Sequence, residues 1–181
     1  MNTYIALFRG INVGGKNILK MKDLDELLET LGAQQVKTYV QSGNVVLQSM
    51  EAPSQLSEKI NQAVQEEYGF ATQVLLLTQS EFEDAIRRNP FPQAESFPKT
   101  MHLGFLVQES ENPKLIELEQ LKASGEEFLL KGKVFYLHAP NGIGRSKLAE
   151  KIEKHLGVPM TMRNWNTVCK LSDIVITKEI E

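Results

Sequence analysis

The sequence predicts an α+β fold built from two successive units, each with the element order β-α-β-β-α-β. Strand-like apolar runs alternate with helical patterns, and a turn signal divides two short strands in each half, at Ser42-Gly43 and at Lys131-Gly132. Prolines gather between the halves. This element order is typical of an antiparallel sheet with helices on one face. A chain of 181 residues has room for one large domain or two small ones.

The elements of the first half follow from periodicity and from helix-ending residues. Leu24, Leu27 and Leu28 share one helical face, and Gly32 and Gly69 are placed to end the two helices. The expected elements are a strand at 3–8, a loop at 9–20, a helix at 21–31, strands at 36–40 and 44–48, a helix from 53 to 69 and a strand at 71–77.

The second half repeats this order after a connecting segment. Asn112 and Pro113 are expected to cap and open a helix, and Gly157 to end the next one. The expected elements are strands at 101–107, 127–130, 134–138 and 159–162, with helices from 112, over 146–156 and from 164.

The predicted boundaries are a first unit at 1–78, a linker at 79–99, and a second unit with a C-terminal helix at 100–181. The linker is expected to hold a short helix at 81–87, with Ser80 and Glu83 as its capping box. Pro90, Pro92 and Pro98 then predict a stiff connection.

Composition narrows the class of protein. The chain is 41% hydrophobic and 24% charged, as is usual for a globular protein. Its one cysteine, Cys169, excludes an intramolecular disulfide framework and is expected to be a core thiol. No apolar run reaches roughly 18 residues, and the first residues lack a signal-peptide pattern. We therefore expect a cytoplasmic protein with no membrane partner.

Charge is distributed unevenly along the chain. The segment 9–22 has four basic residues and no acidic one, and the segment 131–170 has eight basic residues and two acidic ones. The net charge is −3, so the rest of the chain is acidic. If the two segments meet in space, they form a positive surface that concentrates anions; otherwise they are solvated lysines.

The first glycine-rich loop, residues 10–17, nearly matches the phosphate-binding pattern G-x-x-x-x-G-K-[ST]. Asn17 lacks the hydroxyl group that would hold magnesium, and the expected helix begins only near Met21. A triphosphate-cleaving site is therefore not expected. Either the loop exposes main-chain N–H groups to another anion, or its glycines only turn the chain.

The second glycine-rich loop, residues 140–147, connects a strand to the N-terminus of a helix. The unpaired N–H groups and the dipole of a helix favour an anion there. Arg145 offers a bidentate guanidinium, Ser146 a hydroxyl group and Lys147 a point charge. The alternative is a capped helix start with solvated basic residues.

Two further polar segments are candidates for ligand binding. Residues 161–166 contain Trp165, which either stacks on a base or sugar, or anchors the last helix with Asn164 as its N-cap. Residues 41–44 form either a simple turn or a ligand contact. His102, His138 and His155 lack metal-ligand spacing, and neither paired carboxylates nor a serine triad is evident. No metal and no cofactor are expected, and enzymatic activity is left open.

Together, the segments 9–17, 39–45, 142–148 and 161–168 resemble a bacterial family catalogued as domain of unknown function 1697. The resemblance extends over the whole chain and implies two ferredoxin-like halves. Because the family has no established activity, it implies no catalytic residue.

The leading hypothesis is that an anionic small molecule, either a nucleotide or a phosphorylated metabolite, binds in a basic cleft between the glycine loops. The alternatives are single-stranded RNA or DNA binding, with 131–136 as a possible RNA-binding strand, and an interaction module without a ligand. A monomer and a homodimer both remain open. The candidate ligand-binding residues are Arg9, Asn12, Gly14, Gly15, Lys16, Asn17, Gln41, Ser42, Asn44, Gly142, Gly144, Arg145, Ser146, Lys147, Arg163, Asn164, Trp165 and Asn166.

Overall fold

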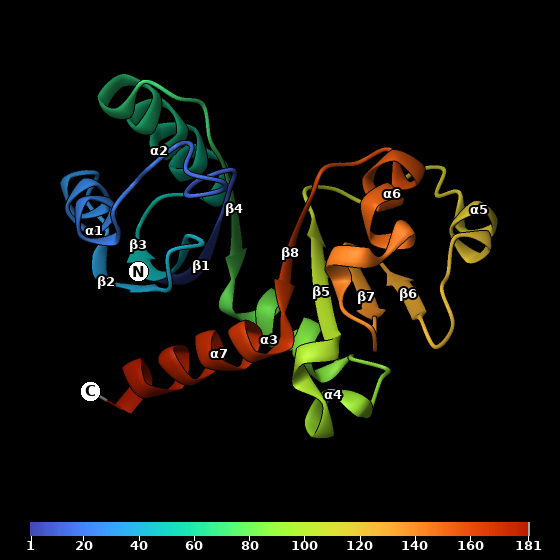
Figure 1. Ribbon diagram of the computed structural model, residues 1–181. Coiled ribbons are helices and arrows are strands. Elements are labelled where there is room, and N and C mark those ends of the chain that lie inside the picture. The colour runs from blue at the N-terminus through green and yellow to red at the C-terminus, as the bar shows by residue number, and fades with distance from the viewer. Residues whose placement is uncertain (181) are drawn as a thin grey trace. The chain divides into compact units, whose positions relative to one another are not determined.

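The computed structural model describes residues 1–180 and divides into two compact units (Figure 1). The first unit comprises Met1–Asp84 together with the end of the chain from Lys170, and the second comprises Ala85–Cys169. Each unit contains one four-stranded antiparallel sheet.

The first sheet has the strand order β2-β3-β1-β4, with the longest strand, β1, next to the edge strand β4. The predicted order of strands and helices is confirmed. The elements are β1 (Asn2–Arg9), α1 (Met21–Thr30), β2 (Gln34–Tyr39), β3 (Asn44–Ser49), α2 (Pro53–Tyr68) and β4 (Gln73–Thr78).

Alternation along the strands places one set of apolar side chains toward α1 and α2. Tyr4, Ala6 and Phe8 of β1 belong to a core cluster that includes Leu24 of α1 and Ile60 of α2. The opposite face of the sheet is buried as well, at Ile5, Leu7 and Val46. Burial on both faces explains why β1 and β3 read as nearly continuous apolar runs rather than as alternating ones.

The second sheet repeats this topology with the order β6-β7-β5-β8. Both units are thus ferredoxin-like, as predicted. The elements are β5 (Met101–Leu106), α5 (Leu115–Gln120), β6 (Glu127–Lys131), β7 (Val134–His138), α6 (Lys147–Leu156) and β8 (Met160–Asn164). The core under α5 and α6 contains Leu118, Phe135, Leu137, Leu148 and Ile152.

In the chain, the segment that connects the two sheets contains α3 (Gln79–Arg87), α4 (Gln93–Ser96) and a 3-10 turn at Pro98–Thr100. The predicted capping box was placed two residues too late. The N–H of Thr78 donates to Oε2 of Glu81 at 2.9 Å, and the N–H of Glu81 donates to Oγ1 of Thr78 at 3.2 Å. Thr78, the last residue of β4, therefore caps the helix directly, and the strand leads into it without a linker.

The prolines of the connection do not exclude helical structure. Pro92 precedes α4 and Pro98 opens the 3-10 turn. Proline is tolerated in the first turn of a helix, where its missing N–H group has no helical acceptor.

The helix predicted from Asn112 begins instead at Leu115, and Lys114 takes the cap position without a side-chain cap. The preceding segment is held by the end of α6, because the N–H of Lys114 donates to the carbonyl oxygen of His155 and the hydroxyl of Ser110 donates to that of Leu156. These tertiary hydrogen bonds override the local capping signal.

The C-terminal helix α7 (Trp165–Ile180) continues from β8. Its buried positions include Trp165, Val168, Leu171 and Val175. Cys169 is exposed, so the predicted core thiol was wrong. The buried residues of α7 recur every three or four positions and so form one stripe along the helix. Cys169 follows Val168 directly, which places it about 100° around the helix from Val168 and outside the stripe. Within residues 1–180, none of the helices combines the length and apolarity that crossing a membrane requires.

Candidate anion-binding site

The second glycine loop forms a capped helix start. Gly142 takes a positive φ of 87°, and a 3-10 turn over Ile143–Arg145 leads to Ser146, the N-cap of α6. Oγ of Ser146 accepts a hydrogen bond from the N–H of Ala149 at 3.0 Å, and Ser146 is only 5% exposed. The capping predicted for this segment is thus present, and its geometry decides which N–H groups remain available.

Two main-chain donors stay open at this helix start. The Ser146 cap takes the N–H of Ala149, and the carbonyl oxygen of Ser146 takes that of Glu150 at 3.2 Å. The N–H groups of Lys147 and Leu148 have no acceptor among the described residues. Both belong to the positive end of the helix dipole, where a bound anion is favoured.

A shallow hollow of about 350 Å³ lies over this helix start. An added Cβ at Gly144 would meet no atom within 4 Å, so a ligand has free access to the main chain there. The volume falls within the range usual for small-molecule sites, about 300–1,000 Å³. The lining residues are Ile143, Gly144, Arg145, Ser146, Lys147, Ala149 and Glu150.

The charged groups at the hollow favour an anion. Arg145 and Lys147 are exposed cations. Glu150, which was not predicted, adds a carboxylate whose Oε1 pairs with Nζ of Lys151 at 2.6 Å. The hydrogen bond from Lys151, with its charge, lowers the pKa of Glu150, which therefore stays ionised. Because Lys151 offsets Glu150, the two cations at the loop remain uncompensated.

Glu150 and Ala149 could have been found from the sequence by helical spacing. They follow Ser146 by four and three residues, which places them over the first turn of α6. The predicted site was confined to the loop and did not include these two helix residues.

The segment 161–166 reaches the same end of the second sheet. In the strand register His102 of β5 faces Asn164 of β8, and Met101 faces His138, the last residue of β7. The second glycine loop leaves β7 at that end. The structure therefore brings two of the predicted segments to one edge of this unit.

Asn164 at this edge has a structural role. Its Nδ2 lies 3.1 to 3.3 Å from the carbonyl oxygens of Pro98, Lys99 and Met101, and its Oδ1 accepts from the N–H of Asn166 at 3.0 Å. Asn164 thus caps α7, as one of the two alternatives predicted. Trp165 is only 9% exposed, which leaves little of its ring for stacking on a ligand.

Arg163 points away from the hollow. The register pairs it with Leu103, so both lie on the sheet face opposite His102 and α6. Its Nη1 donates to the carbonyl oxygen of Met162 at 3.0 Å. Burial lowers the pKa of Arg163 to about 10, and the guanidinium is still charged at neutral pH.

The first glycine loop belongs to the first unit and forms a small hairpin. The N–H of Lys16 donates to the carbonyl oxygen of Val13 at 3.0 Å, with Gly14 and Gly15 at positive φ between them. Gly14 and Gly15 are needed because a two-residue hairpin turn of this type requires positive φ at both positions. Lys16 is exposed at this tip.

The asparagines expected to orient a ligand fasten this loop instead. Nδ2 of Asn12 donates to the carbonyl oxygens of Leu19 at 2.7 Å and Gln41 at 2.8 Å, and its Oδ1 accepts from the N–H of Leu19 at 2.8 Å. Nδ2 of Asn17 donates to the carbonyl oxygen of Gly10 at 2.7 Å.

The hairpin tip at 41–44 adjoins the first loop. The N–H of Phe8 donates to the carbonyl oxygen of Gly43 at 2.8 Å, and a Cβ at Gly43 would collide with Phe8 and Ile11. Asn44 is fully buried and donates to Oγ of Ser42 at 2.9 Å. The structure thus brings these two predicted segments together, with exposed Gln41 and Ser42 at their surface.

The RNA-binding pattern at 131–136 finds no support in the geometry. Phe135 and Tyr136 of the RNA-binding pattern are buried, and the Tyr136 hydroxyl donates to the carbonyl oxygen of Ala85 at 2.8 Å. Within residues 1–180, no cluster of three His, Cys, Asp or Glu side chains is arranged to hold a metal ion.

Comparison with known proteins gives a family but no activity. Among curated proteins, none matches this chain. A solved structure described as conserved bacterial protein SP0830 from Streptococcus pneumoniae is similar, with 28% sequence identity and a TM-score of 0.65 over 96% of this chain and 98% of that one. The family model described as "Protein of unknown function (DUF1697)" matches residues 1–136. The motif segments 9–17 and 39–45 lie within the matched residues, whereas 142–148 and 161–168 lie beyond them. The chain belongs to this family, as predicted.

Proposed function

We propose that the protein binds a phosphorylated small molecule at the N-terminus of α6. The observation that carries the proposal is the hollow over two open N–H groups, those of Lys147 and Leu148, with Arg145 and Lys147 beside it. A phosphate group has the charge and the acceptors to use all of these donors.

Ser146 adds a further donor without giving up its cap. Its Oγ accepts from the N–H of Ala149, so its O–H hydrogen is free to turn toward a ligand. Gly142 and Gly144 carry no side chain that would keep the phosphate away from the main chain.

The rest of the ligand has its own partners. The hollow, at about 350 Å³, is larger than a phosphate group needs, and Ile143 and Ala149 give it an apolar lining. Glu150 is ionised and accepts hydrogen bonds, which suits a hydroxyl or amino group on the ligand. A nucleoside monophosphate or a sugar phosphate meets these conditions.

The test is a titration followed by amide NMR shifts, with inorganic phosphate, ribose 5-phosphate and adenosine monophosphate as probes. We expect the amide signals of Lys147 and Leu148 to move most. Arg145→Ala is expected to weaken binding by about tenfold or more, since it removes charge-assisted hydrogen bonds. Lys154→Ala, at the far end of α6, is the matched control and should bind normally. Probes that leave the Lys147 and Leu148 signals in place at millimolar concentration contradict the proposal.

The prediction that both glycine loops share one ligand is separate from this proposal, because the loops belong to different units; it stays a prediction with its own test. If Lys16 reaches the same ligand, Lys16→Ala weakens phosphate binding, and its effect combined with Arg145→Ala is not additive. Normal binding by Lys16→Ala would confine the site to α6.

A further inference from the structure

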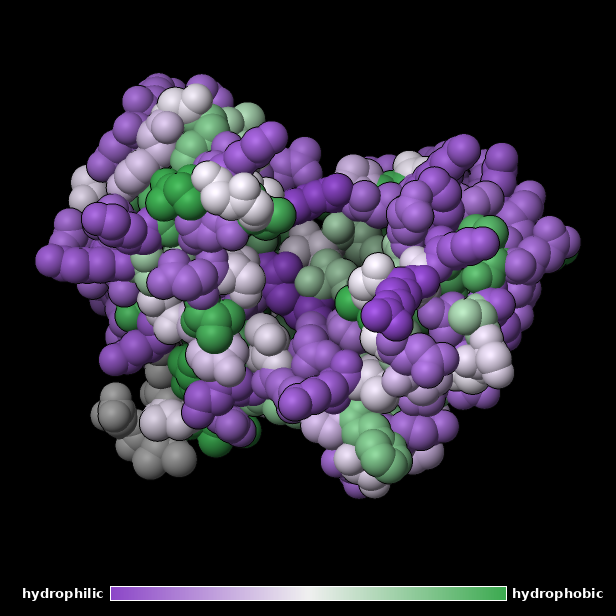
Figure 2. Space-filling view, in the orientation of Figure 1, coloured by the Kyte–Doolittle hydropathy of each residue, from purple (hydrophilic) through white to green (hydrophobic). Residues whose placement is uncertain are grey.

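An apolar and basic tip lies on the first unit, whereas the hollow over α6 belongs to the second unit. We call the first of these the loop tip and define it by five exposed residues: Val13, Lys16, Ile18, Lys20 and Val40. Of its three aliphatic residues, Val13 is 67% exposed, Ile18 is 57% exposed and Val40 is 48% exposed. Figure 2 shows that hydrophobic residues on the visible face stand in small groups among hydrophilic ones, so apolar surface of this kind is local.

The hydrogen bonds of Asn12 hold these residues in one place. Asn12 bonds to Gln41 through its side chain and to Asn17 through its main chain, at 2.8 and 3.0 Å. Val13 follows Asn12, Ile18 follows Asn17 and Val40 precedes Gln41 in the sequence. All three exposed aliphatic residues therefore flank the same hydrogen-bonded group.

The main chain of the loop tip includes three non-glycine residues with positive φ. Val40 has a φ of 52°, in the left-handed region that a β-branched residue rarely adopts. Asn12 and Asn17 are in the same region, at 54° and 51°. Strain of this kind tends to occur where a site is held ready for a partner. It is consistent with a surface that binds without rearrangement.

The charge of the loop tip is entirely positive. Neither 9–22 nor 34–49, the two segments that meet there, contains an acidic residue. Lys16 lies between Val13 and Ile18 in the sequence, and Lys20 follows Ile18 by two residues. A surface that combines exposed aliphatic and basic side chains fits a partner that is apolar and acidic.

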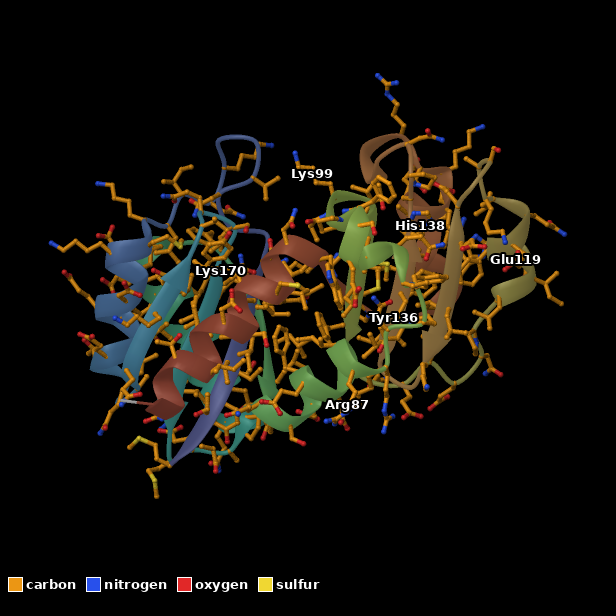
Figure 3. All side chains as sticks on the ribbon, turned by 90° about the horizontal axis from the view of Figure 1, so that it is seen from below. Arg87, Lys99, Glu119, Tyr136, His138 and Lys170 are labelled. Atoms are coloured by element: carbon orange, nitrogen blue, oxygen red, sulfur yellow. The ribbon has the colours of Figure 1, made fainter. Side chains whose placement is uncertain are left out.

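The second unit of the same chain offers such a surface. Ile116 of α5 is 75% exposed. Four exposed glutamates lie within 107–120, together with Lys114. Oε2 of Glu119 pairs with Nζ of Lys122 at 2.6 Å, so the net charge of this surface comes mainly from the other three glutamates. Figure 3 shows Glu119 projecting from α5 at the margin of its unit. We call Ile116 with Glu109, Glu111, Glu117 and Glu119 the acidic face.

We propose that the loop tip of one copy of this chain docks on the acidic face of a second copy. The aliphatic side chains of the loop tip cover Ile116, and Lys16 and Lys20 face the glutamates. In a two-fold dimer the same contact occurs twice, because each copy supplies both surfaces. This association is independent of phosphate binding at α6.

The experiment measures mass by sedimentation equilibrium at low and at high salt. We expect the wild-type protein to associate at low salt and to dissociate as salt screens the charges. The double variants K16E/K20E and E117K/E119K should each be monomeric alone. A one-to-one mixture of the two should associate again, because opposite charges then face each other across the interface.

The matched control is K99E/K170E, which makes the same change in net charge as K16E/K20E at exposed lysines outside both surfaces and should associate as the wild type does. Melting temperatures verify that every variant is folded. A wild-type protein that stays monomeric at low salt overturns the proposal, as does a mixture that fails to associate. Phosphate titration of the wild-type protein reads the α6 site separately, so failure of one proposal is distinguishable from failure of the other.

Discussion

The replacement Ser146→Asp separates the structural role of Ser146 from its role toward a ligand. Asp is as good an N-cap as Ser, so its carboxylate accepts the hydrogen bond from the N–H of Ala149 in place of the hydroxyl. The negative charge also interacts favourably with the helix dipole, by about 0.3–1 kcal/mol. The free energy of unfolding should therefore stay unchanged or rise slightly.

Phosphate binding should respond in the opposite direction. A carboxylate about 4 Å from a phosphate charge is repelled by about 4 kcal/mol at the effective dielectric constant near a protein surface. Even half of this value lowers affinity by more than about tenfold. Ser146→Ala has the opposite combination of effects. It removes the cap, which lowers the free energy of unfolding by about 1 kcal/mol, and it adds no charge that repels phosphate.

The assay pairs urea denaturation with the phosphate titration on the same variants. We expect Ser146→Asp to be stable and unable to bind, and Ser146→Ala to be less stable and to bind more weakly than wild type. A Ser146→Asp protein that binds phosphate as the wild type does would refute the reasoning, because it would place the anion away from the start of α6.

Three further predictions concern stability. Gly104→Ala should destabilise the second unit by about 1–3 kcal/mol, because the new Cβ would collide with the Met160 side chain; the urea midpoint measures this, and an unchanged midpoint contradicts it. Asn12→Ala should cost about 2–3 kcal/mol, since three hydrogen bonds to the main chain are lost; thermal unfolding tests it. Burial lowers the pKa of His102 below its ordinary 6.5, so the unfolded chain takes up a proton more readily and stability should fall as the pH drops through 6.5; in His102→Gln the slope of stability against pH should be smaller.

The repeat of elements could be predicted from the sequence because its signals are local. Gly69 and Gly157 end α2 and α6 in the left-handed conformation, as glycine at these positions indicates. Pro53 opens α2 at its first turn for an equally local reason.

The errors arise where tertiary contacts outweigh a local signal. Asn112 and Pro113 form a valid capping pattern, but hydrogen bonds from Ser110 and Lys114 to the end of α6 hold that segment out of a helix. The spacing of four residues between Trp165 and Cys169 predicts a shared helix face, whereas the buried stripe of α7 runs from Trp165 through Val168, Leu171 and Val175.

The sequence indicates which loop forms the candidate site, but it does not indicate how the side chains of the site are arranged. Arg145, Ser146 and Lys147 could be chosen from residue type, because a helix N-terminus favours anions. Asn12 was chosen on similar grounds, yet its hydrogen bonds run to Leu19 and Gln41, and the latter is distant in the sequence. A side chain's availability to a ligand depends on such long-range contacts.

The first unit contains an internal control for the α6 site. Its second helix, α2, occupies the place in the repeat that α6 occupies in the second unit, and both follow the third strand of their sheet. The equivalents of Arg145, Ser146 and Lys147 are then Glu51, Ala52 and Pro53.

Each of these three residues at the start of α2 lacks a feature that favours an anion at the start of α6. Glu51 reverses a charge, Ala52 caps α2 without a side-chain hydrogen bond, and Pro53 has no N–H group to donate. In the phosphate titration, the amide signals of Ser54 and Gln55 should therefore stay in place while those of Lys147 and Leu148 move. Equal shifts at both helices would mean that phosphate responds to helix dipoles in general. Since the two helix starts share one topology, a difference between them can only come from the residues that α6 carries and α2 lacks.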